Sequence, residues 1–204
     1  MPRRPRPKFA TWTGHAFRAT SYDVPLWALP NRRAGRWNLT GQGSTQYLCL
    51  DAEAPFAEML RHEDLRNEIA AAQYRTTLWQ VRVDEGAMVD YRDFDAVETA
   101  GFSPDAIVED DHERCQAEAD WLRGHGARGV LSTSASLPGS VNLTLFGPRV
   151  AIRWSARPRL TSALPVQKLA SGGPPAGLVR RVRFFGQPHT DLAHWRARRA
   201  SRER

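Results

Sequence analysis

The stretch GRWNLTGQGSTQYLCLDAEAPFAEMLRHE, residues 35–63, contains the clearest passage from strand to helix in this 204-residue chain. Residues 46–50 form a short, mostly apolar run that predicts a buried strand. Asp51 follows at once and is a residue type that caps helix N-termini. Phe56 and Leu60 then lie four positions apart, which predicts an apolar helix face. A strand that passes directly into a helix indicates a fold that combines both.

Outward from this unit, short strands and helices alternate without an internal repeat. Apolar runs and alternating patterns predict further strands at residues 11–20, 75–83, 128–131, 141–146 and 150–154. Residues 109–124 are the best predicted helix, since Cys115, Ala119 and Leu122 fall at helical spacing. We therefore expect an α+β domain with a single mixed β-sheet and flanking helices.

Composition divides the chain into three parts. Residues 1–9 are rich in proline and arginine and predict a disordered basic N-terminal tail. Residues 10–160 hold the predicted strands and helices and form the expected domain. Beyond them the pattern weakens, and SGGPPAG at residues 171–177 is typical of a linker. Residues 161–204 are therefore expected to be a C-terminal extension with a linker and a basic tail.

The net charge of +7 belongs to the two ends of the chain. The first ten residues carry +4 and residues 177–204 carry +6, so the residues between them sum to −3. Only two of the 29 basic residues are lysines, a bias that a GC-rich genome produces without selection for phosphate binding. We expect solvated basic ends that contact nucleic acid weakly if at all.

Several classes of protein and site are disfavoured. The chain has no apolar run long enough to span a membrane, and no apolar segment follows the basic N-terminus. Cys49 and Cys115 lie in unrelated contexts and supply neither a disulfide framework nor a four-ligand zinc site. Gly41 and Gly43 lack the third glycine of a dinucleotide loop, and neither a P-loop nor an HExxH sequence is present. We expect a cytoplasmic protein that does not bind a membrane and has no catalytic metal.

Four separated blocks of sequence carry a specific resemblance. They are Phe17-Arg18; Gly35-Arg36-Trp37-Asn38; Tyr47 with the helix sequence Glu58-Met59-Leu60-Arg61-His62; and Gly129-Val130-Leu131-Ser132-Thr133-Ser134. In their order and spacing, over about residues 12–155, the chain resembles the RES-domain family, the toxin component of bacterial RES-Xre toxin–antitoxin pairs. The resemblance implies an ADP-ribosyltransferase-like fold, with NAD bound as a substrate rather than as a resident cofactor. It also implies cleavage of the nicotinamide–ribose bond and neutralisation by an Xre-like antitoxin, and leaves open a homodimer or a toxin–antitoxin hetero-oligomer.

The residue types in these blocks suit that chemistry. Arg18 and Arg36 could clamp the pyrophosphate of NAD, because a guanidinium forms paired charged hydrogen bonds. Cleavage leaves positive charge on the ribose, which the carboxylate of Glu58 would stabilise. Tyr47 offers an aromatic face for nicotinamide. Arg18, Glu58 and a serine hydroxyl form the expected catalytic set; register favours Ser134 for the hydroxyl, with Ser132 as the alternative.

Trp37 and Asn38 complete the expected binding residues through their place in the resemblance. Taken singly, each of these side chains also has a plain structural role: tryptophan and tyrosine are commonly core residues, and a loop asparagine commonly satisfies backbone groups. His62 shares the helix face of Glu58 and could line the same pocket.

Three functions therefore remain open at this point. The first is a toxin that consumes NAD by hydrolysis or phosphorolysis. The second is an ADP-ribosyltransferase that modifies a protein target through the same pocket. The third is a non-catalytic binding module whose basic tails contact nucleic acid, and its binding would fall steeply with salt.

Overall fold

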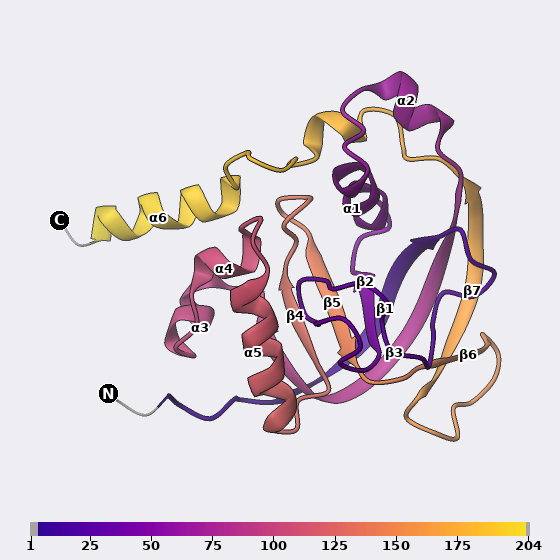
Figure 1. Cartoon of the computed structure of the whole chain (residues 1–204), viewed down its shortest axis with the longest axis horizontal. Helices are drawn as coiled ribbons and strands as arrows, with labels where there is room; N and C mark the ends of the chain where they lie inside the picture. Colours follow the sequence, from indigo (N-terminus) through magenta and orange to yellow (C-terminus); the bar gives the residue numbers. More distant parts are fainter. Residues whose placement is uncertain (1–3, 203–204) are drawn as a thin grey trace.

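Strand β3, Thr76–Tyr91, is the longest element of the chain and joins the two halves of its sheet. The computed structural model describes residues 4–202 and places seven strands in the order β1-β2-β5-β4-β3-β7-β6 (Figure 1). The other strands are β1 (Ala10–Thr20), β2 (Thr45–Cys49), β4 (Gly129–Thr133), β5 (Val141–Phe146), β6 (Val150–Arg153) and β7 (Ala163–Gly172). Parallel and antiparallel pairs both occur, so the predicted single mixed sheet is confirmed.

Strand β1 connects two parts of the sheet. It pairs with β3 along its whole length, from Ala10↔Met88 to Thr20↔Thr77. Within the described residues, its pairing with β2 consists of one position, Phe17↔Cys49. Because a single pair holds these two strands together, side chains near Phe17 and Cys49 border a loosely closed seam in the sheet.

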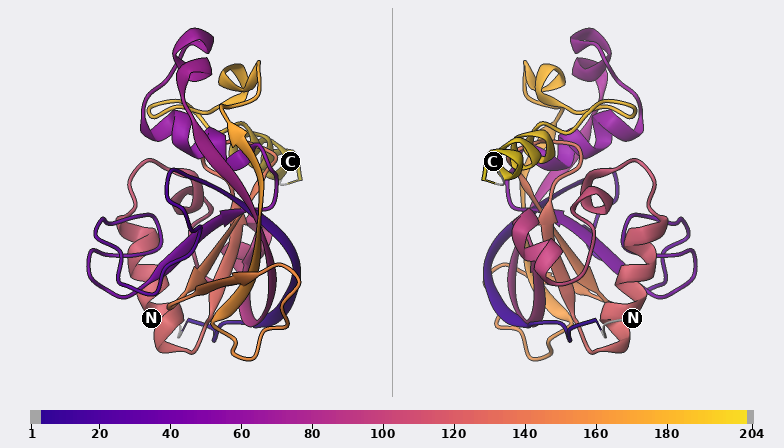
Figure 2. Two further views of the ribbon diagram at one scale, coloured as in Figure 1. Left: turned by 90° about the vertical axis from the view of Figure 1, so that its right-hand side faces the viewer. Right: turned by 90° about the vertical axis from the view of Figure 1, so that its left-hand side faces the viewer.

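Helices cover the sheet on one side and at one end. They are α1 (Ala54–His62), α2 (Glu68–Gln73), α3 (Phe94–Thr99), α4 (Pro104–Val108), α5 (Glu113–Gly124), the 3-10 turn η1 (Leu178–Arg181) and α6 (Thr190–Arg202). Figures 1 and 2 show α3, α4 and α5 gathered beside the sheet, with α1 and α2 at the end away from the N-terminus. Between residues 4 and 202, no helix combines the length and apolar character needed to cross a membrane.

The predicted helix after β2 is confirmed, although its cap differs from the expectation. α1 begins at Ala54, and Glu53 rather than Asp51 occupies the N-cap position. The Asp51 carboxylate instead accepts a hydrogen bond from the Ser140 hydroxyl at 2.5 Å. α1 buries Phe56 and Leu60 in one cluster with η1, as the helical spacing predicts.

Composition predicts a linker and a tail after residue 160, but the structure places regular elements there. β7 pairs in parallel with β6 and antiparallel with β3. α6 packs through Leu192 and Trp195 in the cluster that also holds α4 and α5. Two buried apolar side chains in a thirteen-residue helix are too sparse a pattern to predict it, and one of the two partners of β7, β3, is distant in sequence.

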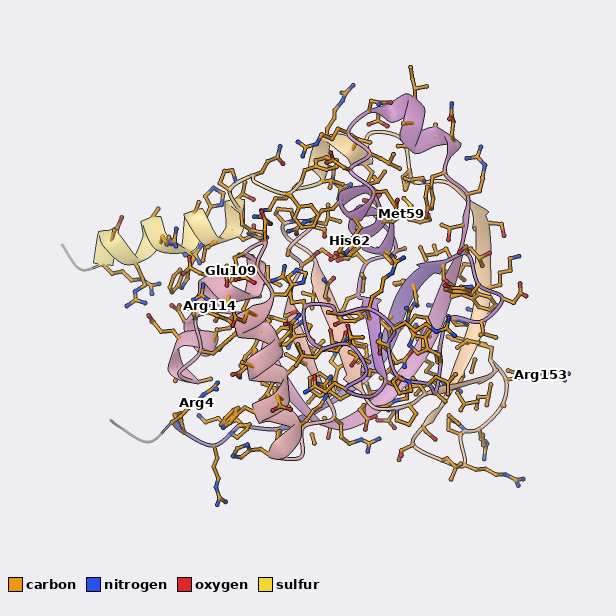
Figure 3. The ribbon with its side chains drawn as sticks, viewed as in Figure 1. Arg4, Met59, His62, Glu109, Arg114 and Arg153 are labelled. Atoms are coloured by element: carbon orange, nitrogen blue, oxygen red, sulfur yellow. The ribbon has the colours of Figure 1, made fainter. Side chains whose placement is uncertain are left out.

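The N-terminal segment also differs from the expected disordered tail. The guanidinium of Arg4 donates two hydrogen bonds, of 2.6 and 2.7 Å, to the carboxylate of Glu118 and stacks 3.8 Å from the Trp121 ring (Figure 3). Glu118 is buried on α5 and needs a cationic partner there. Residues 1–3 of the predicted tail lie outside the described residues.

Candidate active site

A cavity of about 420 Å³ lies between β1, β2, β5, α1 and the loop that joins β1 to β2. Six of the seven residues expected at the site line it: Arg18, Arg36, Trp37, Asn38, Tyr47 and Glu58. The seventh, Ser134, is fully buried and is not among the lining residues. His62 and Met59, labelled on α1 in Figure 3, also line the cavity.

Glu58 projects from α1 into a set of hydrogen-bond donors. Its carboxylate accepts bonds from the Ser136 hydroxyl at 2.5 Å and from the Asn142 side chain at 2.7 Å. The Ser134 hydroxyl adds a longer contact of 3.3 Å. These donors orient the carboxylate and satisfy its oxygens on the side of β4 and β5.

The surroundings of Glu58 keep it ionised. Burial on its own would raise the pKa of this carboxyl, because a low-dielectric site disfavours charge. The hydrogen bonds from Ser136 and Asn142, with the nearby positive charges of His62 and Arg61, outweigh burial and hold its pKa below the ordinary value. The cavity therefore contains a fixed negative charge at neutral pH.

The serine loop, residues 134–140, brings two hydroxyl groups to Glu58, those of Ser134 and Ser136. The Ser134 hydroxyl accepts the backbone N–H groups of Ser136 and Leu137, at 3.3 and 3.1 Å, and so closes a turn. Ser132 lies within β4, where it pairs with Asn142. Ser136, which sequence spacing did not indicate, makes the shortest of the bonds to Glu58. The sequence SASLPGS, residues 134–140, predicts a turn, but it does not indicate which of its hydroxyl groups faces α1.

Arg18 on β1 brings an unpaired positive charge into the cavity. Its guanidinium stacks over the Trp27 ring at 3.8 Å. Its Nη1 atom is buried and has no hydrogen-bond partner among the described residues. Burial lowers the pKa of Arg18 to about 10, so the side chain remains protonated at neutral pH. A protonated guanidinium whose buried Nη1 atom has no partner is suited to bind an anion.

Arg36 lines the cavity but is held by the main chain. Its two terminal nitrogens donate to the carbonyl oxygens of Ala106 and Glu109, at 3.1 and 2.8 Å. These neutral carbonyls fix the guanidinium at the end of α4 without neutralising its charge. Arg36 is therefore a fixed positive wall of the cavity, and its hydrogen-bonding capacity is already partly used.

Tyr47, Trp37 and Asn38 form one hydrogen-bonded unit in the wall of the cavity. The Tyr47 hydroxyl accepts the Trp37 backbone N–H at 2.9 Å and donates to the Asn38 side chain at 2.7 Å. A Cβ atom at Gly35 would lie 2.6 Å from that hydroxyl, so this position requires glycine. Trp37 and Asn38 are fully buried, and this part of the expected binding set has a structural role.

Two polar side chains on β5 lie outside the set of expected site residues. Asn142 and Thr144 both line the cavity, and the Asn142 Oδ1 and Thr144 Oγ1 atoms are buried without hydrogen-bond partners in residues 4–202. Neither residue carries a charge, and neither belongs to the four blocks of sequence described above. Together with Arg18, these atoms give the cavity several polar groups that a ligand could satisfy.

Arg61 and His112 also line the cavity. Arg61 is buried and paired with Asp110 at 2.6 Å. Burial, with the nearby charges of Arg36 and Arg61, lowers the pKa of His112 to about 4, so this ring is neutral at pH 7. No group of three or more His, Cys, Asp or Glu side chains in the described part of the chain is arranged to hold a metal ion.

Comparisons with known proteins agree with this architecture. Residues 5–163 match the family model of the RES domain. A chain in the crystal structure of the M. tuberculosis MbcT-MbcA toxin–antitoxin complex is 25% identical in sequence, with a TM-score of 0.60 over 86% of this chain and 91% of that chain. The comparison with curated proteins found no match. The RES model spans more than three-quarters of the chain, and the solved structure confirms the predicted fold class. This chain therefore belongs to the RES-domain family.

Proposed function

We propose that this protein is the toxin of a toxin–antitoxin pair and that it consumes NAD by cleaving the nicotinamide–ribose bond. The observation that carries the proposal is the presence, in one cavity, of the ionised Glu58 carboxylate and the unpaired Arg18 guanidinium. A dinucleotide that contains an anionic pyrophosphate and develops a cationic ribose needs one charge of each sign.

The reaction is a displacement at the ribose carbon. The bond between that carbon and the nicotinamide nitrogen breaks, and its electron pair leaves with nicotinamide, which becomes neutral. Glu58 stabilises the positive charge that develops on the ribose, and this interaction is stronger in the transition state than in the ground state. Water then forms the new bond to carbon and releases a proton to solvent, or hydrogen phosphate forms it through a deprotonated oxygen. Either acceptor uses the same carboxylate.

Other side chains that line the cavity are expected to bind the rest of NAD. The Arg18 guanidinium is the expected partner of the pyrophosphate, at roughly 1.5 to 3 kcal/mol per charged hydrogen bond. The Tyr47 ring supplies an aromatic surface, while its hydroxyl remains bound to Asn38. Asn142 Oδ1 and Thr144 Oγ1 are free to bind ribose hydroxyl groups.

An antitoxin partner is part of the proposal. The similar solved structure is a toxin–antitoxin complex, and this chain matches it over most of its length. We expect a cognate antitoxin that binds this chain and prevents NAD turnover.

Expression of the chain without an antitoxin tests the proposal in cells. We expect growth arrest together with a fall in cellular NAD, measured by chromatography of cell extracts. The Glu58→Gln variant should allow growth and leave NAD unchanged. Arrest at constant NAD would contradict NAD consumption and would favour modification of a protein target through the same cavity.

A further inference from the structure

We propose that the C-terminal segment, residues 183–191, completes the active site and that Phe185 is the wall against which the nicotinamide ring of NAD stacks. The inference rests on the proposed function, because it requires NAD in this cavity. It assigns a binding role to a residue beyond residue 163, where the match to the RES model ends.

The C-terminal segment is bound directly to the serine loop. The Arg183 backbone N–H donates to the Ser136 carbonyl at 2.8 Å, and its side chain donates to the Ala135 carbonyl at 3.4 Å. The buried His189 ring donates from Nε2 to the Ser134 carbonyl at 2.9 Å. The C-terminal segment thus binds three consecutive carbonyl groups of the serine loop, whose hydroxyl groups donate to Glu58. Figure 1 shows the same segment passing the end of the β4–β5 hairpin on its way to α6.

The position of Phe185 is fixed from both sides. Asp110 accepts the Gly186 backbone N–H at 2.7 Å and forms an ion pair with Arg183 at 3.0 Å. Gly186 has a φ of +81°, which a glycine adopts without strain. The guanidinium of Arg61, itself paired with Asp110, lies 4.4 Å from the centre of the Phe185 ring. The ring lines the cavity and is 38% exposed.

The place of Phe185 along α1 indicates which ring of NAD it meets. Glu58, Arg61 and His62 share one face of α1, because residues three and four apart are neighbours on a helix. Phe185 contacts Arg61 and lies 6.0 Å, between ring centres, from His62. It therefore lies about one helical turn, roughly 5 Å, along α1 from the carboxylate. Nicotinamide is bonded directly to the ribose carbon that Glu58 faces, whereas adenine lies beyond the pyrophosphate and a second ribose.

Affinity measurements on full-length protein test this role. The Glu58→Gln background is expected to slow turnover by about 100-fold or more. Calorimetry on this background can therefore measure the affinities for NAD and for ADP-ribose, which lacks nicotinamide. We expect Phe185→Ala to weaken NAD binding by about 5- to 10-fold, the range expected for loss of an aromatic stacking partner, and to leave ADP-ribose binding unchanged. Phe185→Leu keeps apolar bulk without a flat ring and should behave like Phe185→Ala, whereas Phe185→Tyr should retain NAD affinity. Phe9→Ala removes a similarly exposed phenylalanine outside the cavity and serves as the control.

Two results would overturn the assignment of Phe185. One is unchanged NAD affinity in Phe185→Ala and Phe185→Leu; the other is an equal loss of affinity for NAD and ADP-ribose. If the Glu58→Gln parent binds neither ligand, the proposed function itself fails. Failure of the Phe185 assignment alone would leave NAD binding by the parent intact, so the two failures are distinguishable.

Discussion

Arg18 illustrates how a single side chain can serve binding at the expense of stability. Burying a guanidinium without a hydrogen-bond partner for Nη1 opposes folding, and stacking on Trp27 compensates for only part of that cost. The lowered pKa of Arg18, to about 10, has the same cause, since burial disfavours the charged form. A group retained under these conditions is typical of a binding site.

Replacing Arg18 by methionine should therefore separate stability from binding. We expect Arg18→Met to leave the unfolding temperature unchanged or raised and to weaken NAD binding by about tenfold or more. Thermal melts and calorimetric titration measure the two effects. Arg82→Met is the matched control, because Arg82 also stacks on a tryptophan, Trp154, but does not line the cavity. A lower unfolding temperature with unchanged NAD affinity would show a purely structural role.

Ser136 should control the pH dependence of the reaction. Its hydroxyl helps to hold the pKa of Glu58 below the ordinary value of about 4.3. In the proposed reaction the carboxylate form of Glu58 is the active one. We therefore expect the wild-type rate to be retained above the pKa of Glu58 in the folded protein and lost as the pH falls through it. Ser136→Ala removes a hydrogen bond that lowers the pKa of Glu58, while burial continues to raise it. The pKa of Glu58 should therefore rise, and the acid limb of kcat/KM should move towards neutral pH.

The pH–rate profile of Ser134→Ala provides the comparison. Ser134 makes the longer bond to Glu58 and closes a turn. We therefore expect Ser134→Ala to lower the unfolding temperature and to shift the acid limb less than Ser136→Ala does. The lowered pKa of Glu58 also stabilises the folded protein, and this contribution has the same pH dependence as the rate. It is fully present above the pKa of Glu58 in the unfolded chain and is lost as the pH falls through its pKa in the folded protein. An acid limb that is identical in wild type and Ser136→Ala would contradict the role of this hydroxyl.

Among the strands and helices, the sequence predicts best those whose formation depends on residues close together in the chain. The strand ending at Cys49 and the helix that contains Glu58 follow from a short apolar run and from helical spacing, and both form as expected. β7 and α6 have weak patterns, since their stability comes from strands and helices far away in the sequence. Composition likewise does not predict that Glu118 is buried and binds Arg4.

The site was predictable to a similar extent. Arg18 and Glu58 have chemistry that can be recognised by residue type and order, and the cavity brings them together. Ser136 and Phe185 enter the site through a turn and through a segment more than 120 residues after α1. No spacing in the sequence connects either of them to Glu58.

The C-terminal elements should be indispensable for folding. Removing residues 178–204 takes away Leu178, Val182 and Phe184, which are buried against Phe56 and Leu60. At roughly 1.5 to 3 kcal/mol for each large side chain, their loss is comparable with the total stability of a domain, about 5 to 15 kcal/mol. We expect no cooperative thermal transition by circular dichroism and no NAD binding.

A shorter truncation provides the control for this prediction. Ending the chain after Ala197 keeps Leu192 and Trp195 and should preserve the cooperative transition. A chain that ended at Gly177 but melted cooperatively and turned over NAD would show that the C-terminal segment is a dispensable tail.

At the scale of the whole molecule, the basic ends are partly bound to the acidic body. Arg4 pairs with Glu118, Arg181 with Glu53 and Arg196 with Asp105. The exposed pairs contribute little to stability individually, about 0 to 1 kcal/mol each. They nevertheless pair arginines of both ends with acidic residues of the rest of the protein. This arrangement favours an enzyme with docked ends over a binding module with free basic tails.

The most direct test of NAD cleavage uses the purified chain and NAD, with products resolved by chromatography in the presence and absence of phosphate. The account predicts that nicotinamide appears as NAD disappears, and the second product identifies water or phosphate as the acceptor. Glu58→Gln should lower the rate by about 100-fold or more with little change in NAD affinity. Glu63→Gln, an exposed change just after α1, should retain the wild-type rate. Absence of nicotinamide release, or an undiminished rate in Glu58→Gln, would contradict the account.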